Sequence, residues 1–244
     1  GTNVAYETGY TGAGTRIAVI DTGIDTDHQS FDNGAFDYAL QQEANGNENY
    51  IKSLDLLDQS KVTAVLSQLN IAQNGVSADD LYYGSKLPFA YNYVDKNTDV
   101  THDNDTQSEH GSHVAGIAAA NKYVPQTDGD ETTYVSALDT VKTQGVAPEA
   151  QLLVMKVFGS NGGAFDSDYM AAIEDAIVLG ADSINLSLGS SYPGPSKYTA
   201  YMDADTDPVP VYQAILDSLA SKDAVVSISA GNSGNWAENA YAGS

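Results

Sequence analysis

The feature that most constrains the fold is an alternation of short apolar runs with segments of helical periodicity. Five runs are continuous and rich in β-branched residues, which is typical of strands buried on both faces of a parallel sheet. They cover residues 15–21, 89–94, 151–157, 182–187 and 224–230. Helical patterns lie between them at residues 110–121, 166–179 and 209–221. This order predicts an α/β fold with helices on both faces of a mainly parallel sheet.

Two stretches interrupt the alternation and are interpreted as insertions. The first, at about residues 32–87, consists mostly of Asn-, Gly- and Asp-rich sequence that is typical of loops. Within it, apolar residues fall at helical spacing over residues 51–69, which predicts one amphipathic helix. The second, at about residues 122–143, is rich in Thr, Asp and Tyr and is predicted to be an irregular surface loop.

Composition excludes several classes of function. The 244 residues include 33 acidic and 10 basic side chains, and the resulting net charge of −23 repels nucleic acid. The chain has no cysteine, which excludes a thiol nucleophile, a disulfide framework and a zinc site built from cysteine. It also has no apolar run of about 18 residues, so we expect no membrane insertion within it.

The first motif with chemical potential is AVIDTGID, which ends the first strand and contains Asp21. A carboxylate at the end of a buried parallel strand lies where α/β folds place their ligands and their chemistry. Alone, the motif leaves three interpretations open. Asp21 could be catalytic, could cap a turn, or could belong to an aspartic protease, in which two such carboxylates share a proton.

The second motif is HGSHVAGI, residues 110–117, at the start of a helical segment. Its small residues would let the helix pack closely against the sheet, with the His110 ring directed at the strand ends. A metal site built on His110 and His113 is the rival interpretation. A zinc-protease helix, however, places two His four residues apart with a Glu between them, and this segment has neither feature. We therefore predict that His113 is a packed structural residue. Taken alone, His110 could be an ordinary histidine at a helix start, but its combination with the Asp21 motif favours a catalytic role.

The third motif is SAGNSG, residues 229–234, at the end of the last strand. Its Asn232 would project an amide from the strand tip, where it could donate to a developing oxyanion. Loss of such a donor costs about 10²–10³ in turnover. Without the other two motifs, a plain Asn-Ser-Gly turn would be the simpler interpretation.

In this order, the three motifs resemble those of the subtilase family of serine endopeptidases. The likeness continues through GVAPEA, MKVF, GAD and INLSLG, at residues 145–150, 155–158, 180–182 and 184–189. The segment KLPFAYNY, residues 86–93, is similar to the lactocepin group of Gram-positive cell-envelope proteinases, to which the C5a-peptidase type is related. The resemblance implies a subtilisin-like three-layer α/β/α fold. Residues 1–244 would be the N-terminal portion of one catalytic domain, ending before the helix that bears the nucleophile.

The resemblance also assigns roles to the three motifs. Asp21 would orient His110, His110 would be the general base and acid, and Asn232 would donate to the oxyanion. The family's chain order places the nucleophilic Ser beyond residue 244, because no segment of the Gly-Thr-Ser-Met-Ala type occurs here. Ser233 lies beside a motif but lacks the glycine that completes a nucleophile elbow. The chain alone is therefore expected to be inactive, with the rest of the catalytic domain as its partner.

The expected substrates are proteins or peptides, which would bind as an added strand between two backbone edges. By resemblance, one edge comprises Ser187, Leu188 and Gly189, and the other comprises Gly162, Gly163 and Ala164. The family further implies an extracellular location, either secreted or attached to the cell wall of a Gram-positive bacterium. A non-catalytic module that binds peptide strands, from a degenerate subtilase, is the alternative function. The related sedolisins use a Glu base and an Asp oxyanion donor, so His110 and Asn232 argue against them.

No cofactor is required for this chemistry, although structural calcium is common in the family. Two acidic runs offer oxygen ligands, but neither has the spacing of an EF-hand loop. They are Asp99, Asp103 and Asp105, and Asp128, Asp130 and Glu131. In so acidic a chain we favour solvated loops over calcium sites, and no metal ligand is assigned.

Overall fold

The computed structural model describes residue 6 and residues 8–103, 105–188 and 217–229. Five strands form a parallel sheet in the order β2-β5-β1-β6-β7. They are β1 (Arg16–Asp21), β2 (Phe89–Asn92), β5 (Gln151–Lys156), β6 (Ser183–Leu186) and β7 (Val225–Ile228). Each strand lies within one of the five predicted runs, and each is one to three residues shorter than the run.

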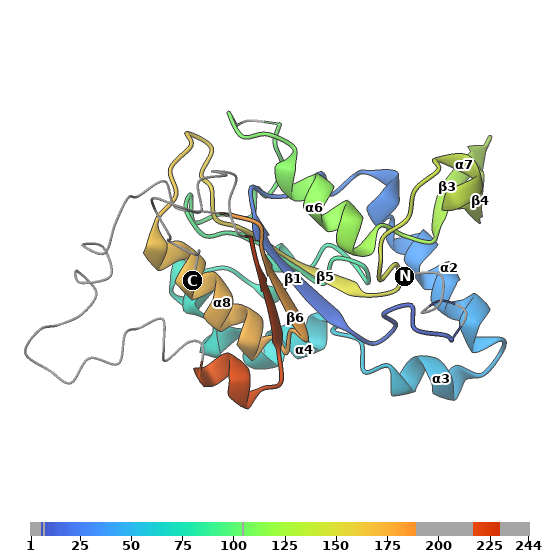
Figure 1. Ribbon diagram of the computed structural model, residues 1–244, viewed down its shortest axis with the longest axis horizontal. Helices are drawn as coiled ribbons and strands as arrows, with labels where there is room; N and C mark the ends of the chain where they lie inside the picture. Colours follow the sequence, from blue (N-terminus) through green and yellow to red (C-terminus); the bar gives the residue numbers. More distant parts are fainter. Residues whose placement is uncertain (1–5, 7, 104, 189–216, 230–244) are drawn as a thin grey trace, which may run out of the picture.

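Two helices cover opposite faces of this sheet (Figure 1). Helix α6 (His110–Ala119) packs with Val19 of β1 in one apolar cluster, whereas α8 (Asp166–Val178) packs with Ala18 and Ile20 in another. Alternate residues of a strand point to opposite faces, so β1 supplies both clusters. The predicted three-layer α/β/α architecture is confirmed. Of the predicted helix at 209–221, only residues 217–221 are described, and they are helical.

The prediction of one long helix over residues 51–69 is wrong. Two short helices, α3 (Glu48–Ser53) and α4 (Gln59–Val65), occupy this segment together with the 3₁₀ turn η2 (Leu66–Gln68). The break lies at Asp55, whose backbone adopts a left-handed conformation with φ of 50°. Asp58 then begins a new helix, because its side chain accepts a hydrogen bond from the backbone N–H of Lys61.

The rest of the first insertion is also more helical than its loop-like composition indicated. After η1 (Gln29–Phe31), helix α2 (Asn33–Ala44) begins at Asp32, whose carboxylate accepts from the N–H of Ala35 at 2.7 Å. The segment continues through η3 (Asn70–Asn74) and α5 (Ala78–Leu81). Composition failed here because Asn and Asp favour helix caps as strongly as turns.

The prediction of an irregular loop at residues 122–143 is wrong as well. Strands β3 (Tyr123–Asp128) and β4 (Glu131–Ser136) form an antiparallel hairpin, followed by the single turn of helix α7 (Ala137–Thr140). Gly129 has a φ of 62° and is the first of the two residues at the tip, as a two-residue hairpin turn of type II′ requires.

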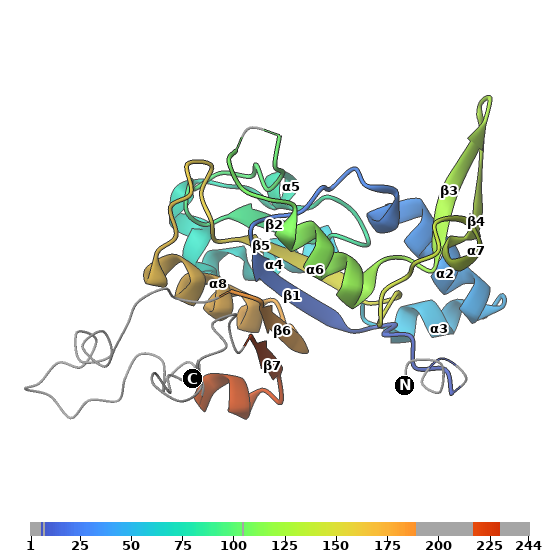
Figure 2. The same cartoon turned by 45° about the horizontal axis from the view of Figure 1, so that its top comes forward.

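The two interrupting segments pack against each other at one end of the molecule. Figure 2 shows the hairpin standing beside α2. The ring of Tyr38 in α2 lies 5.0 Å from that of Tyr123 and 5.2 Å from that of Tyr134, measured between centroids. Aromatic pairs at this spacing add to the stability that burial provides. Within the described residues, no helix is long and apolar enough to cross a bilayer.

Candidate active site

The site is built around a carboxylate and an imidazole at the carboxyl end of the sheet. Asp21, the last residue of β1, is 1% exposed, and its Oδ1 lies 2.7 Å from Nδ1 of His110. His110 is the first residue of α6, and its side chain is 49% exposed. The structure therefore brings together the two residues that the sequence predicted as catalytic.

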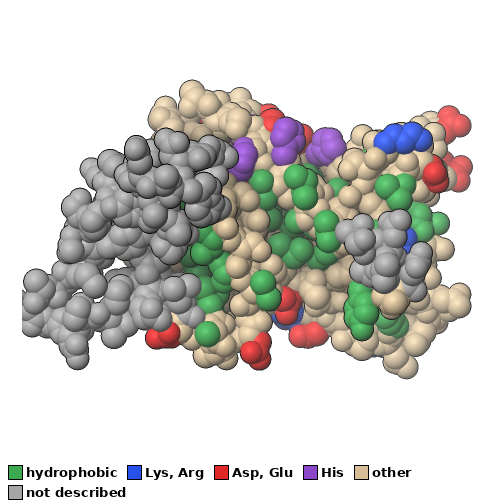
Figure 3. All heavy atoms as spheres, in the orientation of Figure 1, with side chains coloured by type: hydrophobic (Ala, Val, Ile, Leu, Met, Phe, Trp, Pro, Cys, Tyr) green, Lys and Arg blue, Asp and Glu red, His purple; other side chains and the backbone are tan. Residues whose placement is uncertain are grey.

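This pairing defines what the imidazole can do. A carboxylate that accepts from Nδ1–H fixes the tautomer of the ring, which leaves Nε2 with a free lone pair. The ring is half exposed, and Figure 3 shows histidine side chains at the surface, above a group of hydrophobic side chains. An exposed base held by a buried carboxylate can accept a proton from an incoming hydroxyl group.

Close backbone contact holds α6 against the end of β1. Gly23 has a φ of 108°, and a side chain on Gly111 would overlap the carbonyl oxygen of Gly23. Thr22 joins the two elements, because its hydroxyl accepts from the N–H of Gly111 at 2.9 Å and donates to the carbonyl of Ser108 at 3.0 Å. At Gly111 only glycine permits so short a separation from β1, whereas a side chain on Gly23 would overlap the carbonyl oxygen of Val100.

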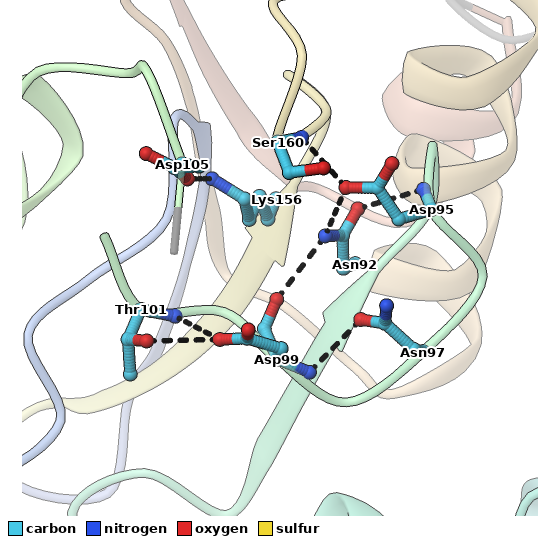
Figure 4. Close-up of a pocket in the computed structure, with 8 residues that line it drawn as sticks. All are labelled: Asn92, Asp95, Asn97, Asp99, Thr101, Asp105, Lys156 and Ser160. Atoms are coloured by element: carbon cyan, nitrogen blue, oxygen red, sulfur yellow. Dashed lines mark hydrogen bonds and ion pairs between the residues drawn. The ribbon is translucent and has the colours of Figure 1, made fainter. Parts of the chain in front are cut away.

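Two further residues near the pair were missed as functional candidates. Lys156, the last residue of β5, is 1% exposed and bonds to the carboxylate of Asp105 at 2.6 Å (Figure 4). A lysine inside a continuous apolar run was the signal that could have identified this residue, since a lysine is rarely buried without a polar partner. Asp105 had been considered only as a calcium ligand.

One prediction for this helix is wrong. His113 is exposed on the outer surface of α6 and is not a packed structural residue. It lies three positions after His110, but the buried residues of the helix are Gly111, Ala115 and Ala119. Because Gly111 and Ala115 define the face that packs on the sheet, His113 falls on the opposite side.

The predicted substrate edges are partly described. Gly162 and Gly163 lie in a tight turn in which the N–H of Gly159 donates to the carbonyl of Gly163 at 2.7 Å. Gln107, three residues before His110, donates to the carbonyl of Gly159 at 2.9 Å, so this turn lies beside the loop that leads to His110. Ala164 follows the turn and is exposed.

On the other predicted edge, Ser187 and Leu188 follow strand β6. The hydroxyl of Ser229 donates to the carbonyl of Leu188 at 2.7 Å, which links this segment to the end of β7. Gly189 and Asn232 lie outside the described residues.

The two acidic runs lie apart, although Asp99 and Asp105 of the first run line one polar hollow. Within the described parts of the chain, no three acidic or histidine side chains are grouped as metal ligands would be. Asp105 pairs with Lys156, Asp99 accepts from Thr101, and Asp103 is exposed. Asp128, Asp130 and Glu131 are exposed at the tip of the hairpin.

The described residues thus combine a three-layer α/β/α fold with an Asp–His pair at the carboxyl end of its parallel sheet. The chain belongs to the subtilase family, whose sequence pattern it matches over residues 12–243. It is 36% identical to the PII-type proteinase of Lacticaseibacillus paracasei over 184 residues, which make up 74% of this chain and 8% of that protein. The C5a peptidase of Streptococcus pyogenes is 31% identical over 74% of this chain and 12% of its own length.

Another relative matches almost the whole chain. The minor extracellular protease Vpr of Bacillus subtilis is 28% identical over 96% of this chain, which corresponds to 20% of that protein. The chain thus spans a small part of each of these relatives. The predicted likeness to the lactocepin and C5a-peptidase group is confirmed.

Proposed function

We propose that this chain supplies the Asp–His part of the active site of an extracellular serine endopeptidase. The observation that carries the proposal is the 2.7 Å contact between the buried carboxylate of Asp21 and Nδ1 of the half-exposed His110. A neighbouring carboxylate stabilises the imidazolium that forms when Nε2 takes a proton. Pairing with His110 also favours this mechanism over an aspartic protease, in which Asp21 would share a proton with a second carboxylate.

In the proposed reaction, His110 moves one proton in each direction. It takes the proton of a serine hydroxyl as the serine oxygen forms a bond to the peptide carbonyl carbon. It then gives that proton to the amine nitrogen as the C–N bond breaks, which leaves an acyl-enzyme. Water repeats the sequence and releases the acid. We place Asn232 as a donor to the oxyanion of both tetrahedral intermediates.

The serine itself is proposed to lie C-terminal to residue 244. The chain contains no Gly-Thr-Ser-Met-Ala type of segment, and the Asp-before-His order is that of subtilisin. The chain also spans only 8–20% of the relatives named above, so those proteins have ample further sequence. The remainder of the catalytic domain is therefore the partner that completes this site.

Peptide substrates are proposed to bind as a strand between the two predicted edges. The turn at Gly162 and Gly163 lies beside the loop before His110, and Leu188 lies where β6 ends. Parallel strands that end at the same edge of a sheet bring such segments together. Backbone pairing of this kind gives affinity while tolerating many side chains.

No cofactor enters this mechanism, and any calcium is proposed to be structural. A chelator should therefore leave the chemical step intact in protein that remains folded. A loss of the chemical step in folded, calcium-free protein would contradict the proposal. We propose a secreted or wall-attached location, which is supported by the likeness to an extracellular protease of Bacillus subtilis.

A fluorophosphonate probe tests the proposed mechanism, because it labels only a serine that is activated by a base. The full-length protein should be labelled, whereas residues 1–244 alone should not. Failure of the full-length protein to react would favour the peptide-binding module instead. Labelling of the isolated chain at Ser233 would contradict the proposed position of the nucleophile.

Substitution of His110 by Ala should lower peptide hydrolysis by about 10⁶-fold, the scale expected when the base of such a triad is removed. His113→Ala is the matched control, because His113 lies on the same helix but is exposed on its outer surface. That variant should retain activity. Equal loss in both variants would show that the helix, and not the His110 base, is responsible.

A further inference from the structure

A buried ion pair lies directly beside the Asp21–His110 pair. Lys156 and Asp105 have side chains that are 1% and 3% exposed, and Nζ lies 2.6 Å from Oδ2 of the carboxylate. Figure 4 shows the ammonium directed at Asp105, at the side of a polar hollow that is also lined by Asn92 and Asp95. Removing two charges from water at this depth costs free energy, so we expect this pair to have a role other than added stability.

The position of Lys156 connects it to Asp21. Strands β1 and β5 run parallel with Asp21 opposite Lys156, so both side chains leave the same face of the sheet. The ammonium also donates to the carbonyl oxygen of Thr22, the residue after Asp21. One buried cation therefore joins the end of β1 to the loop that contains Asp105.

That loop leads directly to His110. Asp105 lies five residues before His110, and its other oxygen, Oδ1, is 3.8 Å from the buried ring of His102. Thr22 completes the connection, since its hydroxyl donates to Ser108 and accepts from Gly111, the residues on either side of the Glu109–His110 step. The N–H of Thr22 donates to Oδ1 of Asp21 at 2.7 Å, the same oxygen that contacts His110.

We propose that Lys156 and Asp105 are positioning residues for the Asp21–His110 pair. They hold the loop before His110 against the strand that carries Asp21, and so keep Nδ1 within hydrogen-bonding distance of the carboxylate. This inference deepens the proposed function and rests on it. Neither side chain touches the reacting atoms, so the effect is exerted through Thr22 and the loop.

An exposed ion pair elsewhere in the chain provides a matched comparison. Lys61 binds the carboxylate of Asp55 at 2.7 Å and the carbonyl of Leu56 at 2.6 Å, which is the same combination of partners. The side chains of Lys61 and Asp55, however, are 38% and 80% exposed. Exposed pairs contribute little to stability, so this pair controls for the loss of one lysine and one aspartate.

The experiment replaces both charges together, as Lys156→Met with Asp105→Asn. Replacement of a buried ion pair by uncharged residues of similar size is often neutral or stabilising, so the double variant is expected to fold. The control is Lys61→Met with Asp55→Asn. All variants are made in the full-length protein.

The first readout is the Nδ1–H proton of His110, observed by NMR in protein labelled at histidine and assigned with His110→Asn. In the double variant this resonance should be lost to exchange with water, while the melting temperature stays near that of the unchanged protein. The second readout is hydrolysis, for which kcat should fall about 10²-fold at unchanged KM, as expected for a displacement of about 1 Å. The control should stay within about twofold in kcat.

Retention of the Nδ1–H resonance and of kcat in the folded double variant would overturn the proposal. If the double variant does not fold, the same measurements are made on Asp105→Asn alone, which keeps Lys156 and its bond to Thr22. Unfolding of that variant too would also overturn the proposal, because the pair would then serve the fold alone. The NMR readout needs no turnover, so it remains informative if the protein proves not to be a peptidase.

Discussion

The two ends of strand β5 carry buried charges that differ in how well they are paired. At the carboxyl end, Lys156 bonds to Asp105 and to the carbonyl of Thr22. At the amino end, Glu149 is fully buried, and its Oε1 has no hydrogen-bond partner among the described residues, although the ammonium of Lys122 is 3.6 Å away. Near it, the buried ammonium of Lys86 donates to the carbonyl oxygens of Pro148 and Ala150, and no carboxylate among the described residues bonds to it.

The poorly paired groups at the amino end of β5 have pKa values shifted by burial. Burial raises the pKa of Glu149 to about 7, with the neighbouring Glu43 contributing in the same direction. Burial likewise lowers the pKa of Lys86 to about 7. The amino end of β5 thus exchanges protons near neutral pH, whereas the carboxyl end uses its charges to fix backbone positions. The comparison predicts that the carboxyl end of the sheet tolerates no added side chain at its close backbone contacts, and that the contribution of the amino end to stability depends on pH.

The sharpest test of the prediction for the carboxyl end of the sheet is Gly111→Ala, at the start of α6. The added methyl group would overlap the backbone carbonyl of Gly23, and backbone cannot rotate away as a side chain can. We expect a loss of about 3 kcal/mol in the free energy of unfolding, at the upper end of the range for overpacking, measured by urea denaturation.

Gly116→Ala in the same helix is the control for Gly111→Ala. Nothing lies within 4 Å of the added methyl group, and alanine is the better helix former, so stability should rise by about 0.5–1 kcal/mol. If Gly111→Ala proved as well tolerated as Gly116→Ala, the close approach of α6 to β1 would be disproved.

The second test uses pH, with the sign set by the direction of each pKa shift. Glu149 binds its proton more tightly in the folded chain, so its contribution to stability is full at low pH and is lost between about 4.5 and about 7. Lys86 binds its proton less tightly when folded, so its contribution grows between about 7 and about 10.5. Together these two groups place a minimum of stability near neutral pH.

Two substitutions separate these contributions. Glu149→Gln should remove the loss of stability as pH rises from about 4.5 to about 7, which is on the order of 3 kcal/mol. Lys86→Met should remove the gain of stability as pH rises from about 7 to about 10.5, which is on the order of 5 kcal/mol. Urea denaturation across this pH range, compared with the unchanged protein, measures both. The comparison between the two ends of β5 fails if neither variant changes the slope.

The Asp21–His110 pair was predictable from sequence because each residue lies in a short, specific motif. Asp21 ends a strand and His110 begins a helix, and the ends of parallel strands meet at one edge of the sheet. Lys156 was not predicted as a partner, because its contact with Asp105 depends on a loop whose path no periodicity specifies.

The other end of the molecule was harder to predict. The break at Asp55 requires a left-handed backbone conformation, which the apolar spacing of residues 51–69 does not reveal. The hairpin carries a turn signal at Gly129, but its strands are largely exposed and lack the alternation of polarity that marks a half-buried sheet. Its packing on α2 depends on aromatic contacts that are distant in sequence.

The smallest effect is expected for Gly34→Ala, which is compared with Gly111→Ala. A methyl group on Gly34 in α2 would overlap the hydroxyl of Tyr134, which is the far end of a side chain that can rotate. The lost packing should be offset in part by the gain in helix propensity, for a net change within about 1 kcal/mol. Tyr134→Phe combined with Gly34→Ala should recover the difference, because the obstructing hydroxyl is gone. A loss as large as that of Gly111→Ala would show that the hairpin is fixed on α2 as rigidly as α6 is fixed on the sheet.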